Sequence, residues 1–182
     1  SFKVVIDNSP VKLSGDRMDV RVRETNLGNA VADALLDYGQ SDFTHKSNLA
    51  VTNGGGLRET IAKDKPITKG DIIAVLPFGN SVAQIQVTGQ NIYDMFVKSL
   101  GSILQVNESG KNVFDENGQP LLEPSGGFLQ VAGARVYYDT TLPTEKRILS
   151  IDILDPETGV YKPLNTTETY YLVTNDFLAC WW

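Results

Sequence analysis

The most informative segment of the sequence reads Leu49-Ala50-Val51-Thr52-Asn53-Gly54-Gly55-Gly56-Leu57-Arg58. Its first four residues predict a short buried strand. The glycines that follow let the backbone approach a ligand closely, and their bare N–H groups can form a nest for an anion beside Arg58. A tight strand-to-helix turn with a surface arginine explains the same residues equally well. The glycine spacing excludes a P-loop and the dinucleotide fingerprint.

Regular elements of both kinds are predicted around this segment. Alternation of apolar and polar residues, or a short apolar run, predicts strands at residues 2–6, 19–23, 83–87, 128–131, 134–138, 149–154 and 170–174. Helical spacing of apolar residues predicts helices at residues 27–38 and 92–100. Their irregular order favours an α+β domain over a doubly wound α/β domain.

Punctuating residues set the expected boundaries of these elements. Thr25 or Asn26 can cap the first helix, and Gly39 is expected to end it. Thr68 is a plausible start of a further helix. Residues 128–131 and 134–138 are placed to pair around Gly133. Residues 105–124 predict a long loop and residues 155–159 a turn.

Composition excludes several classes of protein. The net charge of −6 disfavours a nucleic-acid partner, which requires a basic face. No apolar run approaches the roughly 20 residues of a membrane span. The single cysteine, Cys180, allows no internal disulfide. Because the chain opens on Ser1 without an initiator Met or a signal peptide, a processed product or an excised domain is expected.

Residues suited to binding are better represented than residues suited to catalysis. Arg21 and Arg23 would share one face of a predicted strand, and their forked donors suit phosphate, although an exposed strand face is the commoner case. Phe78 and Phe177 lie near turns. Each is either a lid on the core or, if the two rings face each other, part of a platform for a nucleobase.

The catalytic inventory is thin. His45 is the only histidine and lies in a polar segment where exposure is expected. No clustered Asp and His pattern predicts a metal site, and no G-x-S-x-G elbow predicts a serine nucleophile. Catalytic and metal-binding residues are therefore both expected to be absent from this chain, which looks like a binder of small anions.

Five segments of the sequence together resemble those of a known protein family. In chain order they are Arg23-Glu24-Thr25-Asn26-Leu27-Gly28-Asn29, Thr52-Asn53-Gly54-Gly55-Gly56-Leu57-Arg58, Val75-Leu76-Pro77-Phe78-Gly79-Asn80, Gly127-Phe128-Leu129-Gln130-Val131-Ala132-Gly133 and Tyr171-Leu172-Val173-Thr174-Asn175-Asp176-Phe177-Leu178-Ala179. Together they resemble the C-terminal, substrate-binding domain of the 5′-nucleotidase family. The resemblance spans nearly the whole chain and implies a mixed-sheet α+β fold with helices packed on the sheets.

The resemblance also implies site residues and partners. Phe78 and Phe177 would sandwich a nucleobase, Asn53 would bond its edge, and Arg23 and Arg58 would neutralise the phosphate. Gly55 and Gly56 would let the backbone close on the ligand. Residues 1–182 would form one domain, and the family's N-terminal metallophosphoesterase domain, with its two divalent metal ions, would be absent. This chain alone would then bind nucleotides without hydrolysing them, and the parent enzyme would act outside the cytoplasm, as a secreted, periplasmic or cell-wall-attached protein.

One departure weakens the ribose contact. Family members continue after the position of Ala179 with a glycine pair and an Asp that holds the ribose hydroxyls, whereas this chain continues with Cys180-Trp181-Trp182. The expectation is a domain shortened at its C-terminal end. Alternatives remain: a non-catalytic binding or adhesion module, or the substrate domain of a 2′,3′-cyclic-nucleotide phosphodiesterase or a UDP-sugar hydrolase.

Overall fold

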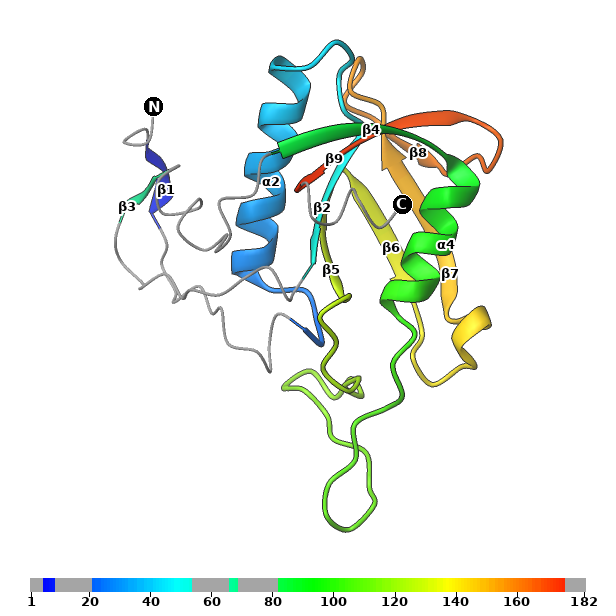
Figure 1. Cartoon of the computed structure of the whole chain (residues 1–182). Helices are drawn as coiled ribbons and strands as arrows, with labels where there is room; N and C mark the ends of the chain where they lie inside the picture. The colour runs from blue at the N-terminus through cyan, green and yellow to red at the C-terminus, as the bar shows by residue number, and fades with distance from the viewer. Residues whose placement is uncertain (1–4, 9–20, 54–65, 69–81, 176–182) are drawn as a thin grey trace.

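Two helices and several short strands make up the described part of the chain (Figure 1). The computed structural model describes residues 5–8, 21–53, 66–68 and 82–175. The helices are α2 (Asn26–Ser41) and α4 (Gly89–Ser99). The strands are β1 (Val5–Asn8), β2 (Leu49–Asn53), β3 (Pro66–Thr68), β4 (Val82–Thr88), β5 (Leu129–Ala132), β6 (Ala134–Tyr138), β7 (Ile148–Leu154), β8 (Tyr161–Pro163) and β9 (Thr169–Asn175), and η2 (Thr144–Lys146) is a 3-10 turn. The mixed α+β class is confirmed.

The central sheet has the strand order β4-β9-β2-β5. β2 and β9 run parallel, whereas β4 pairs antiparallel with β9 and β5 antiparallel with β2. One face of the sheet packs on α2, through Ala50 and Val173, and the other packs on α4 and β7, through Leu49 and Leu172. Both faces are covered, so β2 is buried along its whole length, as its apolar run predicts.

Helix α2 confirms its predicted start and corrects its predicted end. The Thr25 side chain accepts a hydrogen bond from the Gly28 N–H, as an N-cap should. The helix continues past Gly39 to Ser41, so the prediction that Gly39 ends it is wrong. A Cβ at Gly39 would lie 2.7 Å from Cγ1 of Val173. This glycine serves close packing of the helix on β9.

Helix α4 begins at a reciprocal cap. The Thr88 hydroxyl accepts from the Asn91 N–H, and the Asn91 side chain accepts from the Thr88 N–H. Ile92 and Phe96 are buried one turn apart, as the predicted apolar face requires. Directly after its last turn, the buried Arg147 donates to the carbonyl of the C-cap residue Leu100 and to that of Ser102. That side chain stabilises the carbonyl end of the helix.

A second sheet, β6-β7-β8, takes the chain away from the first. The pairing of residues 128–131 with 134–138 is therefore wrong: β5 pairs with β2, and β6 pairs with β7. Gly133 has φ +75°, and a Cβ there would overlap the backbone of Asn48. The chain passes from one sheet to the other at this residue, where only glycine fits. The predicted turn at 155–159 does connect β7 to β8, through Gly159 at φ +74°.

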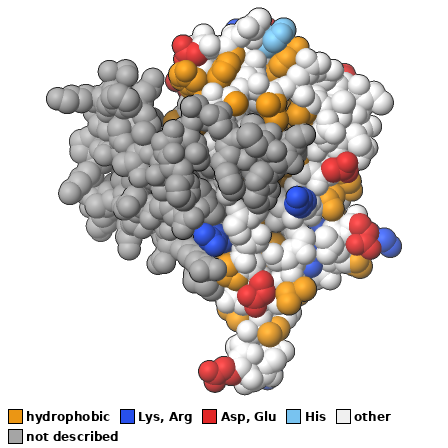
Figure 2. Space-filling model, in the orientation of Figure 1, with side chains coloured by type: hydrophobic (Ala, Val, Ile, Leu, Met, Phe, Trp, Pro, Cys, Tyr) orange, Lys and Arg blue, Asp and Glu red, His pale blue; other side chains and the backbone are white. Residues whose placement is uncertain are grey.

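The predicted long loop forms a projecting extension, defined here as residues 103–122 (Figure 1). Isolated bridges join Leu104 to Leu122 at its base, and Val106 to Asn112 and Phe114 to Pro120 further out. Ile103, Val106 and Phe114 are among its exposed side chains, and Figure 2 shows hydrophobic side chains on the surface near the extension. The extension is thus two consecutive tight turns on a narrow stem.

Three further predicted elements lie partly or wholly outside the described residues. Residues 21–23 form a turn, so the predicted strand at 19–23 is wrong for them, and residues 19–20 lie outside the described part. Of the first predicted strand, at residues 2–6, residues 5–6 lie in β1, and residues 2–4 lie outside the described part. The possible helix after Thr68 falls outside the described residues, and Thr68 itself ends β3. None of the described helices has the length and apolar character needed to cross a membrane.

Candidate functional site

Asn53 ends β2 with one half of its side-chain amide bonded and the other half unused. It is 7% exposed. Its Nδ2 donates to the Gly126 carbonyl at 3.0 Å, whereas its Oδ1 has no hydrogen-bond partner among the described residues. A buried acceptor without a donor costs about 1–3 kcal/mol. The geometry therefore leaves a buried carbonyl oxygen that an N–H of a ligand would satisfy.

Arg23 lies in the turn that leads into α2, and a buried glutamine fixes that turn. Gln130, which is 1% exposed, donates from Nε2 to the Arg23 carbonyl at 2.7 Å and accepts from the Thr25 N–H at 3.1 Å. Gly28 packs directly on this amide, because a Cβ there would overlap the Gln130 side chain. Gln130 thereby bonds the backbone on either side of Glu24, at the Arg23 carbonyl and at the Thr25 N–H.

Asn53 and the Arg23 turn are brought to one corner of the domain. Within the β2–β5 pair, Asn53 stands opposite Leu129, next to Gln130, the residue that braces Arg23. Residues 125–126 connect the same two places: the Ser125 N–H donates to the Arg21 carbonyl at 3.0 Å, and the Gly126 carbonyl accepts from Asn53. We call Arg23, Gly28, Asn53 and Gln130 the braced corner.

The guanidinium of Arg23 has a carboxylate partner from the extension. Its Nη1 lies 2.7 Å from Oε2 of Glu116, and the two side chains are 32% and 71% exposed. The hydrogen bond from Arg23 holds the pKa of Glu116 below its ordinary value, with help from the backbone N–H of Glu116 and the positive charge of Arg23. A charged carboxylate is therefore the resident partner of this arginine.

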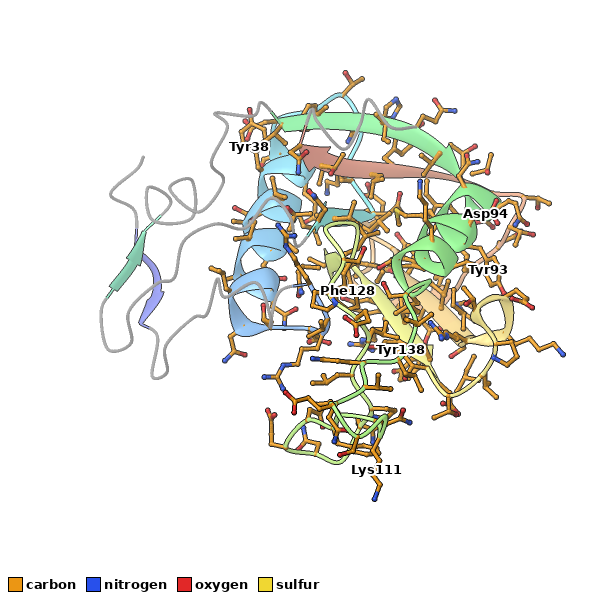
Figure 3. All side chains as sticks on the ribbon, turned by 60° about the horizontal axis from the view of Figure 1, so that its bottom comes forward. Tyr38, Tyr93, Asp94, Lys111, Phe128 and Tyr138 are labelled. Carbon is orange, nitrogen blue, oxygen red and sulfur yellow. The ribbon has the colours of Figure 1, made fainter. Side chains whose placement is uncertain are left out.

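A cavity of about 770 Å³ lies between the Arg23 turn, the second turn of the extension and the end of β6. Its charged lining is mostly acidic: Arg23, Glu24, Asp115, Glu116 and Asp139. Tyr138 forms another part of the wall where β6 ends, and Figure 3 shows it near the base of the extension, with Lys111 at the far tip. Partial burial, together with the charges of Glu24 and Asp115, raises the pKa of Tyr138.

Five of the predicted site residues lie outside the described part of the chain: Gly55, Gly56, Arg58, Phe78 and Phe177. The strand ends that lead to them are described. β2 and β9 are parallel, so Asn53 and Asn175, the last residues of these strands, lie at the same end of the sheet. Val82, which follows the segment containing Phe78, pairs with Asn175.

His45 lies away from the braced corner. It is exposed, as predicted, and its ring stacks on Tyr171 with centroids 4.1 Å apart. It precedes the amino end of β2, whereas Asn53 ends that strand. Across the described residues, no group of three or more His, Cys, Asp or Glu side chains could hold a metal ion.

Sequence reasoning missed Gln130 and Glu116, and it missed the buried Arg147. The Gly-Phe-Leu-Gln segment that contains Gln130 was part of the resemblance, but nothing local shows that the amide reaches back more than a hundred residues. Glu116 is separated from Arg23 by 93 positions. Its signal is only that it lies in a tight Asp-Glu-Asn-Gly turn.

The described part of the chain is an α+β domain in which a buried amide and a braced arginine share one corner. The model of the 5′-nucleotidase C-terminal domain family matches residues 5–180, and the chain belongs to that family. The family resemblance and its extent along the chain are both confirmed.

Relatives and solved structures agree with this membership. The chain is 34% identical over 169 residues to the trifunctional nucleotide phosphoesterase protein YfkN of Bacillus subtilis, covering 93% of this chain and 10% of that protein. It is 32% identical to a snake venom 5′-nucleotidase of Gloydius brevicauda, covering 96% and 28%. The crystal structure of a 5′-nucleotidase precursor from Thermus thermophilus superimposes with a TM-score of 0.71 at 33% identity, covering 97% and 30%. The chain spans less than a third of each.

Proposed function

We propose that this chain is the substrate-binding domain of a secreted or surface nucleotide phosphohydrolase. In this proposal residues 1–182 form one domain that grips the base, ribose and phosphate of a nucleotide. It presents the phosphate to two divalent metal ions on an N-terminal metallophosphoesterase domain. The observation that supports this proposal most directly is the buried Asn53 Oδ1. It has no hydrogen-bond partner among the described residues and lies in the same corner as Arg23.

The chemistry of the corner suits two different parts of one ligand. The carbonyl oxygen of Asn53 can accept from an amino or ring N–H on the edge of a base, and the desolvated setting makes that bond worth more than it would be in water. The guanidinium of Arg23 can bond a phosphate through two parallel N–H donors. Base and phosphate are separated by a ribose, so two recognition points set apart along the ligand match a nucleotide.

The other assigned residues complete the proposal through the family resemblance. Phe78 and Phe177 would stack on the two faces of the base, which accounts for tolerance of different bases. Arg58 would join Arg23 at the phosphate, and Gly55 and Gly56 would allow the close approach of the backbone. The metal ions of the full-length enzyme would supply the activated water and the charge neutralisation. This chain supplies binding and orientation.

A binding experiment on the purified chain separates the two recognition points. Titration calorimetry with adenosine and AMP should show that Asn53→Ala weakens both ligands about five- to fiftyfold, from one lost buried hydrogen bond. Arg23→Gln should weaken AMP and leave adenosine unchanged. No phosphate should be released from AMP with added divalent metal. Metal-dependent turnover, or a wild-type chain that binds neither ligand, would contradict the proposal.

A second candidate keeps the same binding surface but widens the substrate class. It is favoured by the 34% identity to a relative named a trifunctional nucleotide phosphoesterase. Under this alternative the domain presents 2′,3′-cyclic nucleotides or nucleotide sugars as well as 5′-monophosphates. Titration of the same chain with a 2′,3′-cyclic nucleotide and with UDP-glucose, beside AMP, distinguishes the two. A location outside the cytoplasm is supported by the similarity to a venom enzyme.

A further inference from the structure

The contact between Arg23 and Glu116 joins the proposed phosphate site to a distant part of the chain. The two residues are 93 positions apart, and their charged atoms are 2.7 Å apart. Glu116 is not carried by the core. It lies on the second turn of the extension, which borders the cavity in which Arg23 is exposed. The arginine is therefore met by a carboxylate from the opposite wall of that cavity.

The turn that carries Glu116 is built to hold its shape. Oδ1 of Asp115 accepts from the N–H groups of Asn117 and Gln119, at 2.8 and 2.9 Å. Gly118 takes φ +76°, a conformation that suits glycine. The bridge between Phe114 and Pro120 closes the turn. Glu116 thus reaches Arg23 from a defined backbone position.

A carboxylate and a phosphate are bound by an arginine in the same way. Both present a pair of oxygens that can accept two parallel N–H bonds from a guanidinium. We propose that Glu116 competes with the phosphate of the ligand for Arg23, and that it is a specificity-determining residue which lowers the affinity for anionic ligands relative to neutral ones. This inference rests on the proposed function, because it takes Arg23 as a phosphate ligand.

The charges around the Arg23–Glu116 pair oppose the binding of a phosphate. Glu24, Asp115 and Asp139 line the same cavity, so with Glu116 bound to Arg23 the charged lining carries a net negative charge that repels phosphate. A phosphate that replaces Glu116 gains the guanidinium but must leave that carboxylate to solvent. Glu116 is already 71% exposed, so its release requires little rearrangement.

The extension contains its own matched control. Its first turn repeats the geometry of the second: Oδ1 of Asn107 accepts from the N–H groups of Ser109 and Lys111, and Gly110 has φ +74°. Glu108 occupies the position that corresponds to Glu116. Among the described residues its carboxylate takes part in no ion pair or side-chain hydrogen bond. Glu108→Gln therefore removes the same charge from an equivalent turn without touching Arg23.

The experiment measures AMP and adenosine affinity for the wild-type chain, Glu116→Gln and Glu108→Gln, with folding checked by circular dichroism. Glu116→Gln should bind AMP about two- to fivefold more tightly, the range expected for release of an exposed ion pair, and adenosine equally well. Glu108→Gln should match the wild type. In an Arg23→Gln background, Glu116→Gln should have no effect on AMP.

Every other outcome contradicts the competition, and one of them also contradicts the proposed function. Equal AMP affinity for Glu116→Gln and the wild type, with both ligands bound, overturns the competition and leaves the proposed function intact. Weaker AMP binding by Glu116→Gln shows that Glu116 positions Arg23 for the phosphate and also overturns it. A wild-type chain that binds neither ligand overturns the proposed function and the competition together. If Glu116→Gln fails to fold, Glu116→Ala answers the same question.

Discussion

The braced corner and the extension are both built from turns, yet they are held in opposite ways. In the corner, Gln130 bonds the backbone of Arg23 and Thr25 from more than a hundred residues away, inside the protein. In the extension, Asn107 and Asp115 bond N–H groups two and four residues ahead, at the surface. The shape of the corner depends on a side chain from the folded core, whereas the shape of the extension is set by hydrogen bonds within its own turns. Substitutions should therefore act very differently in the two regions.

The largest difference is expected at glycines. Gly28→Ala should lower the free energy of unfolding by about 3 kcal/mol, because the new methyl overlaps the Gln130 side chain and displaces its hydrogen bonds. Gly110→Ala in the extension meets no atom within 4 Å and suffers only from its positive φ, about 1 kcal/mol. Urea denaturation of both variants measures the contrast. Equal losses would show that the corner adapts freely.

Removing the side chains that hold each turn should give a smaller contrast. Gln130→Ala leaves the Arg23 carbonyl and the Thr25 N–H without their partner in a half-buried setting, at a cost of about 2 kcal/mol. Asn107→Ala also removes two backbone bonds, but water replaces them, and the loss should stay below about 1 kcal/mol. Thermal unfolding of the two variants tests this. A larger loss for Asn107→Ala would invert the comparison.

The smallest effect links the two regions through a titration. The bond from Arg23 lowers the pKa of Glu116, so the pairing is fully present above the ordinary glutamate value and is lost as the pH falls through the lowered pKa. NMR titration should show the Glu116 pKa rising toward its ordinary value in Arg23→Gln, because only the contribution of its backbone N–H remains. Asp139, whose pKa is lowered by hydrogen bonds from Thr141, should not change. A Glu116 pKa that is the same in the wild type and in Arg23→Gln would show that the two side chains are not paired in solution.

Local patterns predicted the elements whose shape is decided locally. Helices α2 and α4, strands β4, β7 and β9, and the turn at Gly159 all follow from periodicity, caps or turn residues. The errors fall where a distant backbone decides. Gly39 and Gly133 are glycines because Val173 and Asn48 lie against them, and no nearby residue reveals that.

Prediction of the candidate site from the sequence had the same limit. Arginines suited to an anion and turn phenylalanines suited to a nucleobase could be picked out of the sequence by their own chemistry, whereas the role of Asn53 was predicted only through the family resemblance. Their surroundings were not identifiable. That Arg23 lies in a turn, braced by Gln130 and paired with Glu116, depends on contacts across about a hundred residues. Such contacts leave no periodic trace in a single sequence.

The place of β9 in the central sheet has a consequence for how the protein is made. β9 is the last described strand in the chain, yet it lies between β4 and β2, which are synthesised long before it. A ribosome therefore releases both of those strands with an open edge that must stay unpaired until residue 175 has emerged. Contacts over such separations close slowly, and the waiting edges invite association with other chains. The nascent domain should need protection late in translation, until β9 is inserted between β4 and β2.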